Sequence, residues 1–329
     1  MKTPVAVLSD DEIRQCAGLD LAALGAVEQS FVWLSDGLVD QPPIMHMSVP
    51  DHDGDVDIKS AYVKGKPSLA VKVAAGFFGN TKQGLPNSSG MVVVVSAKTG
   101  RCEAILLDNC YLTDLRTGLA GAVAAKHLAP AEGSVLGVIG AGVQARFQAE
   151  AYALVRPLSK IYVAARAPGQ LAAYKADMER SLNVEVEIAP SIEAAVRHSD
   201  TIVSTTPSKT ALIQADWLRL GQHITAMGSD LPGKQELDPA VLCRADVVVA
   251  DKPAQSLTHG EAQHLSEDER ALVDIMPLGD VIAGKVDGRK SAEDVTVCDL
   301  SGIGVQDTAI ALHVLKTAQA SALGHIFQT

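Results

Sequence analysis

The stretch Ser134–Ala151, "SVLGVIGAGVQARFQAEA", joins a short apolar run to a glycine pair and then to a helix-forming run. Gly140, Gly142 and Ala145 fit the pattern G-x-G-x-x-G/A. In this pattern the first glycine permits a tight turn, the second lets a pyrophosphate approach the backbone, and the third small residue lets the helix pack closely on the strand. The helix N-terminus offers free N–H groups to phosphates. The stretch therefore predicts a dinucleotide-binding turn, with a plain strand-turn-helix junction as the alternative.

Further short runs rich in valine and isoleucine follow this turn, and helical stretches separate most of them. Strands that alternate with helices indicate a parallel sheet covered on both faces. We therefore expect an α/β fold whose larger part, residues 119–302, is a Rossmann dinucleotide-binding domain. The runs are "KIYVAAR" (160–166), "VEVEIA" (184–189), "DTIVSTT" (200–206), "QHITAMGS" (222–229) and "ADVVVAD" (245–251).

The remainder of the chain has a different texture. Ser9–Glu12 forms a capping box and predicts a helix start, and a second helix is expected over 21–34. Residues 54–97 contain alternating or apolar runs punctuated by glycine, which predicts antiparallel strands. An alanine-rich helix ends near Pro130, and the last helix, "VQDTAIALHVLKTAQASALG", packs back on the first part. This predicts a discontinuous α+β domain, residues 1–118 and 303–329.

Composition limits the classes of partner. The 329 residues carry a net charge of −11 and show no basic stripe, so we expect neither nucleic-acid nor membrane binding. The five cysteines form no C-x-x-C pair, as in reduced proteins. No run resembles a signal peptide or a membrane span, so we expect a cytoplasmic protein. The histidine spacing predicts no metal site.

Four charged residues stand beside apolar or glycine-rich segments and are candidate site residues. Lys72 interrupts the apolar run "LAVKVAAGFF", and buried lysines are rare unless paired or functional. Arg116 opens the alanine-rich helix and offers a planar fork for a carboxylate. Asp230 follows a predicted parallel strand, where ligands bind in such sheets, and Lys59 lies in an alternating strand. Surface or structural charges are the alternative for all four.

Cofactor choice is open at the strand 160–166. An Asp or Glu at its end would hold the ribose 2′-OH of NAD, but this strand ends in Ala164, Ala165 and Arg166. Arg166 could pair with the 2′-phosphate of NADP or stack on adenine. The sequence therefore allows NAD(H) or NADP(H).

Six segments together resemble the ornithine cyclodeaminase/μ-crystallin family over almost the whole chain. The resemblance implies a nicotinamide-dependent enzyme acting on the Cα–N bond of an amino or imino acid, with NAD(H) slightly favoured. It also implies a Rossmann domain and a second, discontinuous domain that binds the substrate and through which the protein dimerises. The segments are "LAVKVAAGFF", "NTKQGLPNSSG", "LLDNCYLTDLRTGLAGAVAAKHLA", "VLGVIGAGVQA", "GSDLPGKQEL" and "DLSGIGVQDTAIA".

The same resemblance implies roles for individual residues. Lys72 and Asp230 match the family's catalytic positions, and Arg116 matches its carboxylate-binding arginine. An arginine often found after the Pro dipeptide is replaced here by Ile44, so His46 or Lys59 is expected to supply the missing cation. The cofactor-binding candidates are Gly140, Ala141, Gly142, Val143, Gln144, Arg166, Thr205, Thr206, Pro207, Met227, Gly228 and Ser229.

Within the family the chain is most similar to the iminosuccinate reductases and to the ectoine-utilisation cyclodeaminase-like proteins. The resemblance therefore favours an NAD(P)H-dependent imino-acid reductase that converts iminosuccinate to aspartate. An ammonia-releasing cyclodeaminase with catalytic NAD is the first alternative. A non-catalytic ligand-binding protein like μ-crystallin is the second.

The run "MVVVVS" (91–96) is unusually apolar for an exposed sheet edge. Because exposed apolar edges need a partner, we expect a homodimer closed through the strands between Gly54 and Ala97.

Overall fold

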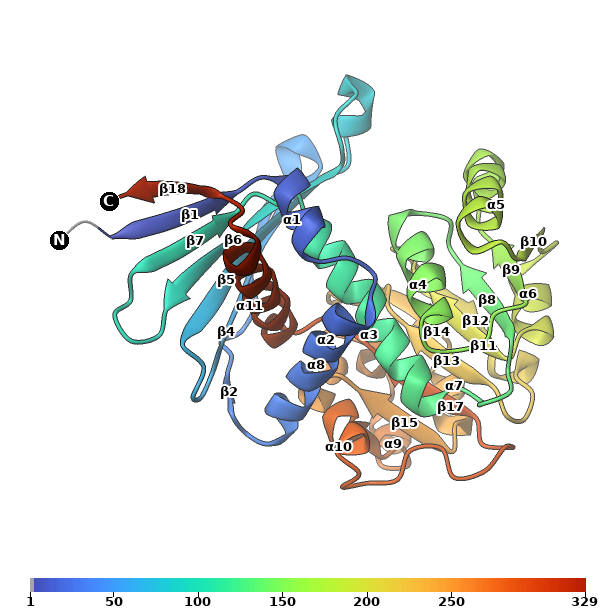
Figure 1. Cartoon of the computed structure of the whole chain (residues 1–329). Helices are drawn as coiled ribbons and strands as arrows, with labels where there is room; N and C mark the ends of the chain where they lie inside the picture. The colour runs from blue at the N-terminus through green and yellow to red at the C-terminus, as the bar shows by residue number, and fades with distance from the viewer. Residues whose placement is uncertain (1–2) are drawn as a thin grey trace. The chain divides into compact units, whose positions relative to one another are not determined.

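The computed structural model describes residues 3–329 and divides into two compact units (Figure 1). Unit 1 comprises Met1–Arg116 and Ile303–Thr329, and unit 2 comprises Thr117–Gly302. The boundaries expected from the sequence are 118/119 and 302/303. Helix α3 (Tyr111–Leu128) begins in unit 1 and ends in unit 2. The two units are described separately below.

Unit 1 is built on one mixed sheet in the order β18-β1-β7-β6-β5-β4-β2, with β3 also paired to β4. Only the β1–β7 pair is parallel. The strands are β1 (Pro4–Leu8), β2 (Val39–Asp40), β3 (Met45–Val49), β4 (Gly54–Val63), β5 (Ser68–Phe77), β6 (Ser88–Ser96), β7 (Cys102–Leu106) and β18 (His325–Gln328). The helices are α1 (Asp10–Cys16), α2 (Leu21–Ser35), α11 (Gly304–Ser321) and the single turns η1 (Pro50–His52) and η2 (Asn80–Gln83).

Several expectations for this unit are confirmed. Ser9 and Glu12 form the capping box that starts α1, and β4, β5 and β6 form an antiparallel meander. Helix α11 packs against β4, β5 and α2, so the end of the chain returns to the first domain (Figure 1). This packing follows from the apolar stripe of α11, which buries Ile310, Val314 and Ala318.

The expectation that residues 91–96 form an exposed edge of the sheet is wrong. These residues belong to β6, which pairs with β5 on one side and β7 on the other. The edges of the sheet are instead β18 on one side and β2 together with β3 on the other. Both faces of β6 carry apolar side chains. Val92 and Val94 are buried on one face, and Val93 and Val95 lie on the opposite, partly exposed face.

Unit 2 holds a fully parallel sheet in the order β10-β9-β8-β11-β13-β17-β15-β16. Its strands are β8 (Val135–Ile139), β9 (Lys160–Ala164), β10 (Glu185–Ile188), β11 (Thr201–Ser204), β13 (His223–Ala226), β15 (Val247–Ala250), β16 (Ile275–Pro277) and β17 (Thr296–Asp299); β12 (Lys209–Ile213) pairs separately with β14 (Gln235–Leu237). The helices are α4 (Val143–Ala153), α5 (Pro168–Leu182), α6 (Ile192–His198), α7 (Pro239–Arg244), α8 (Pro253–His259), α9 (Glu267–Arg270), α10 (Leu278–Ile282), η3 (Ala215–Trp217) and η4 (Glu261–His264).

The strand order of this sheet reverses at β8. The chain runs outward through β9 and β10 on one side and continues through β11 and β13 on the other. Ligands of open parallel sheets bind beyond the carboxyl ends of the strands at such a reversal. The loops after β8 and β11 are therefore the first place to look for a ligand. Across residues 3–329, no helix is long and apolar enough to cross a membrane.

Candidate functional site

In the glycine turn after β8, Gly140 and Gly142 are glycines for different reasons. Gly140 has φ +121°, and a Cβ there would lie 2.5 Å from the Thr205 hydroxyl oxygen, so the fold itself requires glycine. Gly142 is the N-cap of α4, and a Cβ there would meet no protein atom within 4 Å. Ala145, in the first turn of α4, is fully buried, and the turn offers the N-terminus of α4 in the geometry that suits a pyrophosphate.

The other cofactor candidates surround the reversal of the sheet. Thr205, Thr206 and Pro207 directly follow β11, and Met227, Gly228 and Ser229 directly follow the neighbouring strand β13. Ala141, Val143 and Gln144 belong to the glycine turn and the first turn of α4. Arg166 is exposed just beyond β9, where no acidic residue follows the strand. The roles of these residues remain predictions.

A buried cluster of charges in unit 1 joins Lys72, Arg116 and Asp307. The Lys72 Nζ lies 3.1 Å from both carboxylate oxygens of Asp307, with hydrogen-bond geometry to Oδ1. Arg116 Nε donates to the same Oδ1 at 3.2 Å, and its Nη1 donates to Gln306 Oε1 at 3.1 Å. Lys72, Arg116 and Asp307 are 3%, 6% and 2% exposed. One carboxylate on α11 thus holds two cations, one from β5 and one from α3.

The charges of this cluster act strongly on one another. Burial lowers the pKa of Lys72 to about 8; Asp307 opposes this change, whereas Arg116 and Lys59 add to it. For Asp307, burial alone would raise the pKa, but Lys72 and Arg116 outweigh it and hold the pKa below its usual value. Asp307 therefore stays ionised, and Lys72 titrates close to physiological pH.

Lys59 lies directly opposite Lys72 in the β4–β5 ladder, so the two side chains share one face of the sheet. Its charge acts on both Lys72 and Asp307. His46 on β3 is placed differently, because its Nδ1 lies 2.8 Å from the carboxylate of Asp57. The structure thus brings Lys59 to the cluster, while His46 has a carboxylate partner of its own and its substrate role remains a prediction.

The sequence reasoning missed three residues of this cluster. Asp307 and Gln306 lie in α11, 235 and 190 residues from their respective partners Lys72 and Arg116. An ionised residue inside the apolar run "VQDTAIALHV" is the signal that could have found Asp307. Asp108 is also buried, caps α3 by accepting the Leu112 N–H at 2.9 Å, and interacts with Lys72. Burial raises the pKa of Asp108.

Asp230 lies in unit 2, on the loop that follows β13. Its side chain is 44% exposed, and its Oδ1 accepts a hydrogen bond from the Lys234 Nζ at 2.5 Å. Ser229 beside it is buried and donates to the backbone oxygen of Lys234 at 2.9 Å. The loop therefore presents Asp230 at the carboxyl end of the sheet with its charge partly balanced.

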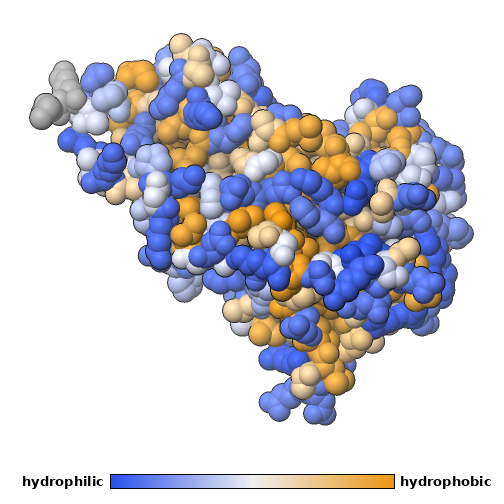
Figure 2. All heavy atoms as spheres, turned by 60° about the horizontal axis from the view of Figure 1, so that its bottom comes forward, coloured by the Kyte–Doolittle hydropathy of each residue, from blue (hydrophilic) through white to orange (hydrophobic). Residues whose placement is uncertain are grey.

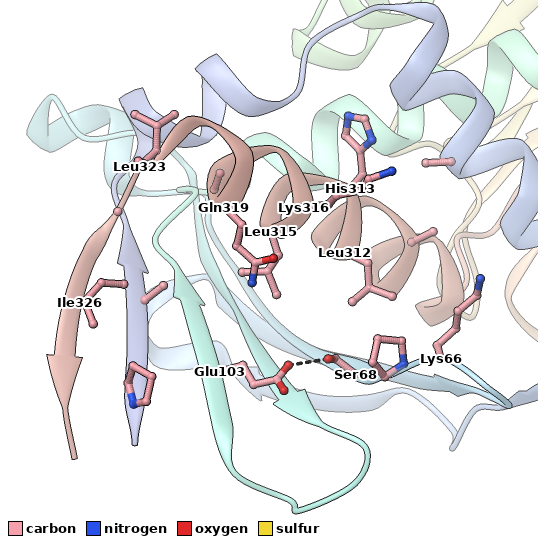
Figure 3. Close-up of a pocket in the computed structure, with 18 of the residues that line it drawn as sticks. Lys66, Ser68, Glu103, Leu312, His313, Leu315, Lys316, Gln319, Leu323 and Ile326 are labelled. Atoms are coloured by element: carbon pink, nitrogen blue, oxygen red, sulfur yellow. Dashed lines mark hydrogen bonds between the residues drawn. The ribbon is translucent and has the colours of Figure 1, made fainter. Parts of the chain in front are cut away.

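A cavity of unit 1, about 960 Å³ in volume, is a groove that contains none of these charges. Figure 3 shows Leu312, Leu315 and Gln319 of α11 pointing from one side toward strands that carry Ser68 and Glu103, which are hydrogen-bonded. Its wall is mostly apolar. It is therefore not the place where the cations of the Asp307 cluster would meet a charged ligand.

Comparison with known proteins shows the family. The model of the ornithine cyclodeaminase/mu-crystallin family matches residues 4–322, and the chain belongs to this family. A putative dehydrogenase of Rhizobium meliloti is 43% identical over 99% of this chain and 100% of its own length. An uncharacterized cyclodeaminase of Sinorhizobium fredii is also 43% identical, over 98% of both chains.

Solved structures agree with the fold over nearly the whole chain. The iminosuccinate reductase of Paracoccus denitrificans, in complex with NAD⁺, has a TM-score of 0.90 at 32% identity and covers 99% of this chain and 100% of its own. An archaeal alanine dehydrogenase dimer with bound NAD has a TM-score of 0.89 at 32% identity and covers 99% of both chains. The resemblance seen in the sequence and the α/β fold class are thereby confirmed.

Proposed function

We propose that the protein is an NAD(P)H-dependent imino-acid reductase and that its substrate is iminosuccinate, which it reduces to aspartate. The observation that carries the proposal is a local cluster of cations in unit 1. Lys59, Lys72 and Arg116 gather around Asp307. Cations in such excess suit a ligand with more than one carboxylate. The similarity to an iminosuccinate reductase supports the same substrate.

The dinucleotide would be held by unit 2. The N–H groups at the start of α4 and the open backbone of Gly142 would receive the pyrophosphate. Thr205–Pro207 and Met227–Ser229 would line the nicotinamide end, since they follow the strands beside the reversal. NAD(H) is favoured because the two solved relatives named above contain it. The bound reduced cofactor supplies a hydride.

The cations of unit 1 would bind and polarise the substrate. Arg116 offers a planar guanidinium to the α-carboxylate, and Lys72 lies beside it through their shared partner Asp307. Lys59 is our candidate for the second carboxylate, because it lies on the same face of the sheet as Lys72. Positive charge near the imine makes its carbon more electrophilic, and fixed positioning adds to the rate.

Asp230 would hold the imine nitrogen through a charge-assisted hydrogen bond. A protonated imine is a stronger electrophile than a neutral one, so a carboxylate that stabilises N–H⁺ would favour the reaction. The exposed carboxylate of Asp230 has an oxygen to spare beyond its contact with Lys234. This role is proposed from the match to the family motif "GSDLPGKQEL".

A cyclodeaminase is the second candidate, and the similarity to the Sinorhizobium fredii protein favours it. In that reaction the cofactor oxidises the amine, an internal amine attacks, ammonia leaves and the hydride returns. Ornithine carries an extra ammonium group, however. That group would be repelled by the excess positive charge around Asp307.

We also propose that the protein forms a homodimer through the sheet of unit 1. The reason is an apolar face of this sheet and not an exposed edge at residues 91–96. One face of this sheet is apolar but only partly buried, with Val71, Val73, Val93 and Val95 in neighbouring positions. Figure 2 shows apolar residues at the surface of unit 1, toward the left of the view. A wide apolar face of this kind favours a second copy as its cover, and the alanine dehydrogenase relative is a dimer.

The test is cofactor consumption by the purified protein. NADH and NADPH oxidation would be followed with oxaloacetate plus ammonia, with pyruvate plus ammonia, and with pyrroline- and piperideine-carboxylates. Ammonia release from ornithine with catalytic NAD would be measured in parallel. Fastest oxidation with oxaloacetate plus ammonia is expected. Ammonia release from ornithine without reduction of the dicarboxylic imine would replace the proposal by the cyclodeaminase.

A further inference from the structure

A chain of buried carboxyl groups runs through unit 2 and ends on the two loops assigned above to the cofactor. Asp299, Glu261 and Glu236 are each no more than 1% exposed. Their hydrogen-bond donors are backbone N–H groups and serine hydroxyls. Buried acids are rare unless their oxygens are satisfied, and here both oxygens of Glu236 and of Glu261 and Oδ2 of Asp299 accept hydrogen bonds, whereas Asp299 Oδ1 has no partner.

Glu236 joins the two loops directly. Its Oε2 accepts the Ser204 hydroxyl and the Gly228 N–H, both at 2.7 Å, and its Oε1 accepts the Thr206 N–H at 2.5 Å. One carboxylate thus fixes the segment after β11 to the segment after β13. A Cβ at Gly228 would overlap both the Thr206 carbonyl oxygen and the Glu236 carboxyl group, so only glycine allows this closure.

Glu261 and Asp299 fix the backbone that carries Glu236. Glu261 accepts the N–H of Glu236 at 2.9 Å on one oxygen and that of Leu237 at 3.0 Å on the other. Asp299 Oδ2 in turn accepts the Glu261 N–H at 2.8 Å and the Ser256 hydroxyl. Asp299 is the last residue of β17 and pairs with Ala226 at the end of β13. The chain of contacts is therefore anchored in the central sheet.

We propose that Glu236 is a positioning residue for the cofactor, held in place by Glu261 and Asp299, and that it acts through the backbone of Thr206 and Gly228. This inference rests on the proposed function, because it takes these two loops as the nicotinamide-binding segments. A carboxylate suits the task because both of its oxygens accept, whereas an amide of the same shape presents donors on one side. Burial raises the pKa of both Glu236 and Glu261.

The variant Glu236→Gln tests the proposal with almost no change of volume. Either orientation of the glutamine puts its NH₂ group against a backbone N–H, of Thr206 or of Gly228, so one loop must give way. We expect the Kd for NADH, measured by fluorescence titration, to rise about tenfold or more, and kcat to fall at saturating cofactor.

Asp200→Asn is the matched control. Asp200 Oδ2 accepts the N–H groups of Ser134 and Val135 at 3.0 and 3.1 Å, at the opposite, amino-terminal end of the same sheet. Asp200 Oδ1 accepts from Arg219 Nη2 at 2.6 Å, so either orientation of an asparagine puts its NH₂ group against a donor, as in Glu236→Gln but far from the two loops. It should lower Tm by a similar amount while leaving the Kd for NADH and kcat near the wild-type values.

The outcomes separate the two claims. Wild-type protein that binds no dinucleotide would refute the proposed function and this inference with it. Wild-type binding together with an unchanged Kd and kcat in Glu236→Gln would refute the inference alone, as would an equal effect in Asp200→Asn. If Glu236→Gln does not fold, Glu261→Gln can replace it. This variant puts an NH₂ group against the backbone N–H of Glu236 or Leu237, the segment that carries Glu236. Glu261→Gln should also raise the Kd for NADH, by a smaller factor. An unchanged Kd in this variant would again refute the inference.

Discussion

The ammonium nitrogen of Lys72 lies 3.1 Å from both carboxylate oxygens of Asp307. Because Asp307 also accepts Arg116, a single acid on α11 sets the position of two cations from β5 and α3. Removing that acid would leave both cations buried without their counter-charge.

We expect Asp307→Asn to destabilise the fold by roughly 3 kcal/mol or more, as when one partner of a buried ion pair is lost. The variant should also weaken substrate binding, since Lys72 would lose the charge that supports its protonated form. Urea denaturation and the KM for the imino acid measure the two effects. A variant as stable as the wild type would contradict the assignment of Asp307 as the shared counter-ion.

Lys72 predicts a pH dependence. Folding lowers its pKa from 10.5 to about 8, so the cation that attracts a carboxylate is present below pH 8 and is lost above it. Succinate has no group that titrates in this range and serves as a stable probe. Its inhibition constant should be constant below pH 8 and should rise above it, by up to about tenfold per pH unit. In Lys72→Met inhibition should be weak and independent of pH; a dependence that persists there would assign the titration to another group.

Gly142→Val separates cofactor binding from folding. No protein atom lies within 4 Å of a Cβ at Gly142, whereas Gly140 has a positive φ and contacts Thr205. We expect Gly142→Val to keep the wild-type Tm and to raise the Kd for NAD(H) by roughly 100-fold. Gly140→Val, the control, should lower Tm instead. Wild-type cofactor affinity in folded Gly142→Val would contradict the dinucleotide-binding role of this turn.

Arg116→Ala and Asp230→Asn should affect different kinetic constants. An arginine on a carboxylate contributes similarly in the ground state and in the transition state, so its loss should raise KM by about 10- to 100-fold. A group at the reacting nitrogen acts where charge changes, so Asp230→Asn should mainly lower kcat. Steady-state kinetics of both variants measure the split, and the reverse pattern would mean that the two roles are exchanged.

The local features of the site could be predicted from the sequence because each depends on neighbouring residues. The turn around Gly140 and Gly142 shows in the strand-turn-helix order, and Lys72 stands out against its apolar strand. The contacts of Asp307 could not be predicted from the sequence, because its partners lie far along the chain and only the packing of α11 brings them together. The apolar run 91–96 gives the wrong expectation of an edge, because strand order within a sheet is not encoded locally. In the structure β7 pairs with the side of β6 that β5 leaves open.

The acids behind the cofactor loops illustrate the same limit. Glu236 lies within a segment that the sequence analysis quotes, but its importance depends on the N–H groups of Thr206 and Gly228, which tertiary contacts alone bring to it. Gly228 is named from the sequence only as a cofactor-binding candidate, and nothing local marks Gly260. Each is needed because a buried carboxylate occupies the space of its Cβ, from Glu236 and Asp299 respectively.

The most direct test of the central claim compares two imines in three proteins. NADH oxidation would be measured with iminosuccinate and with the imine of pyruvate, for wild type and for Lys59→Ala. Lys64→Ala, which removes an exposed lysine directly after the end of β4, is the control. Wild type and the control should prefer the dicarboxylic imine, and Lys59→Ala should lose most of that preference, by about 10-fold or more in kcat/KM. A wild-type protein that releases ammonia from ornithine without net NADH consumption and does not reduce iminosuccinate would contradict the account.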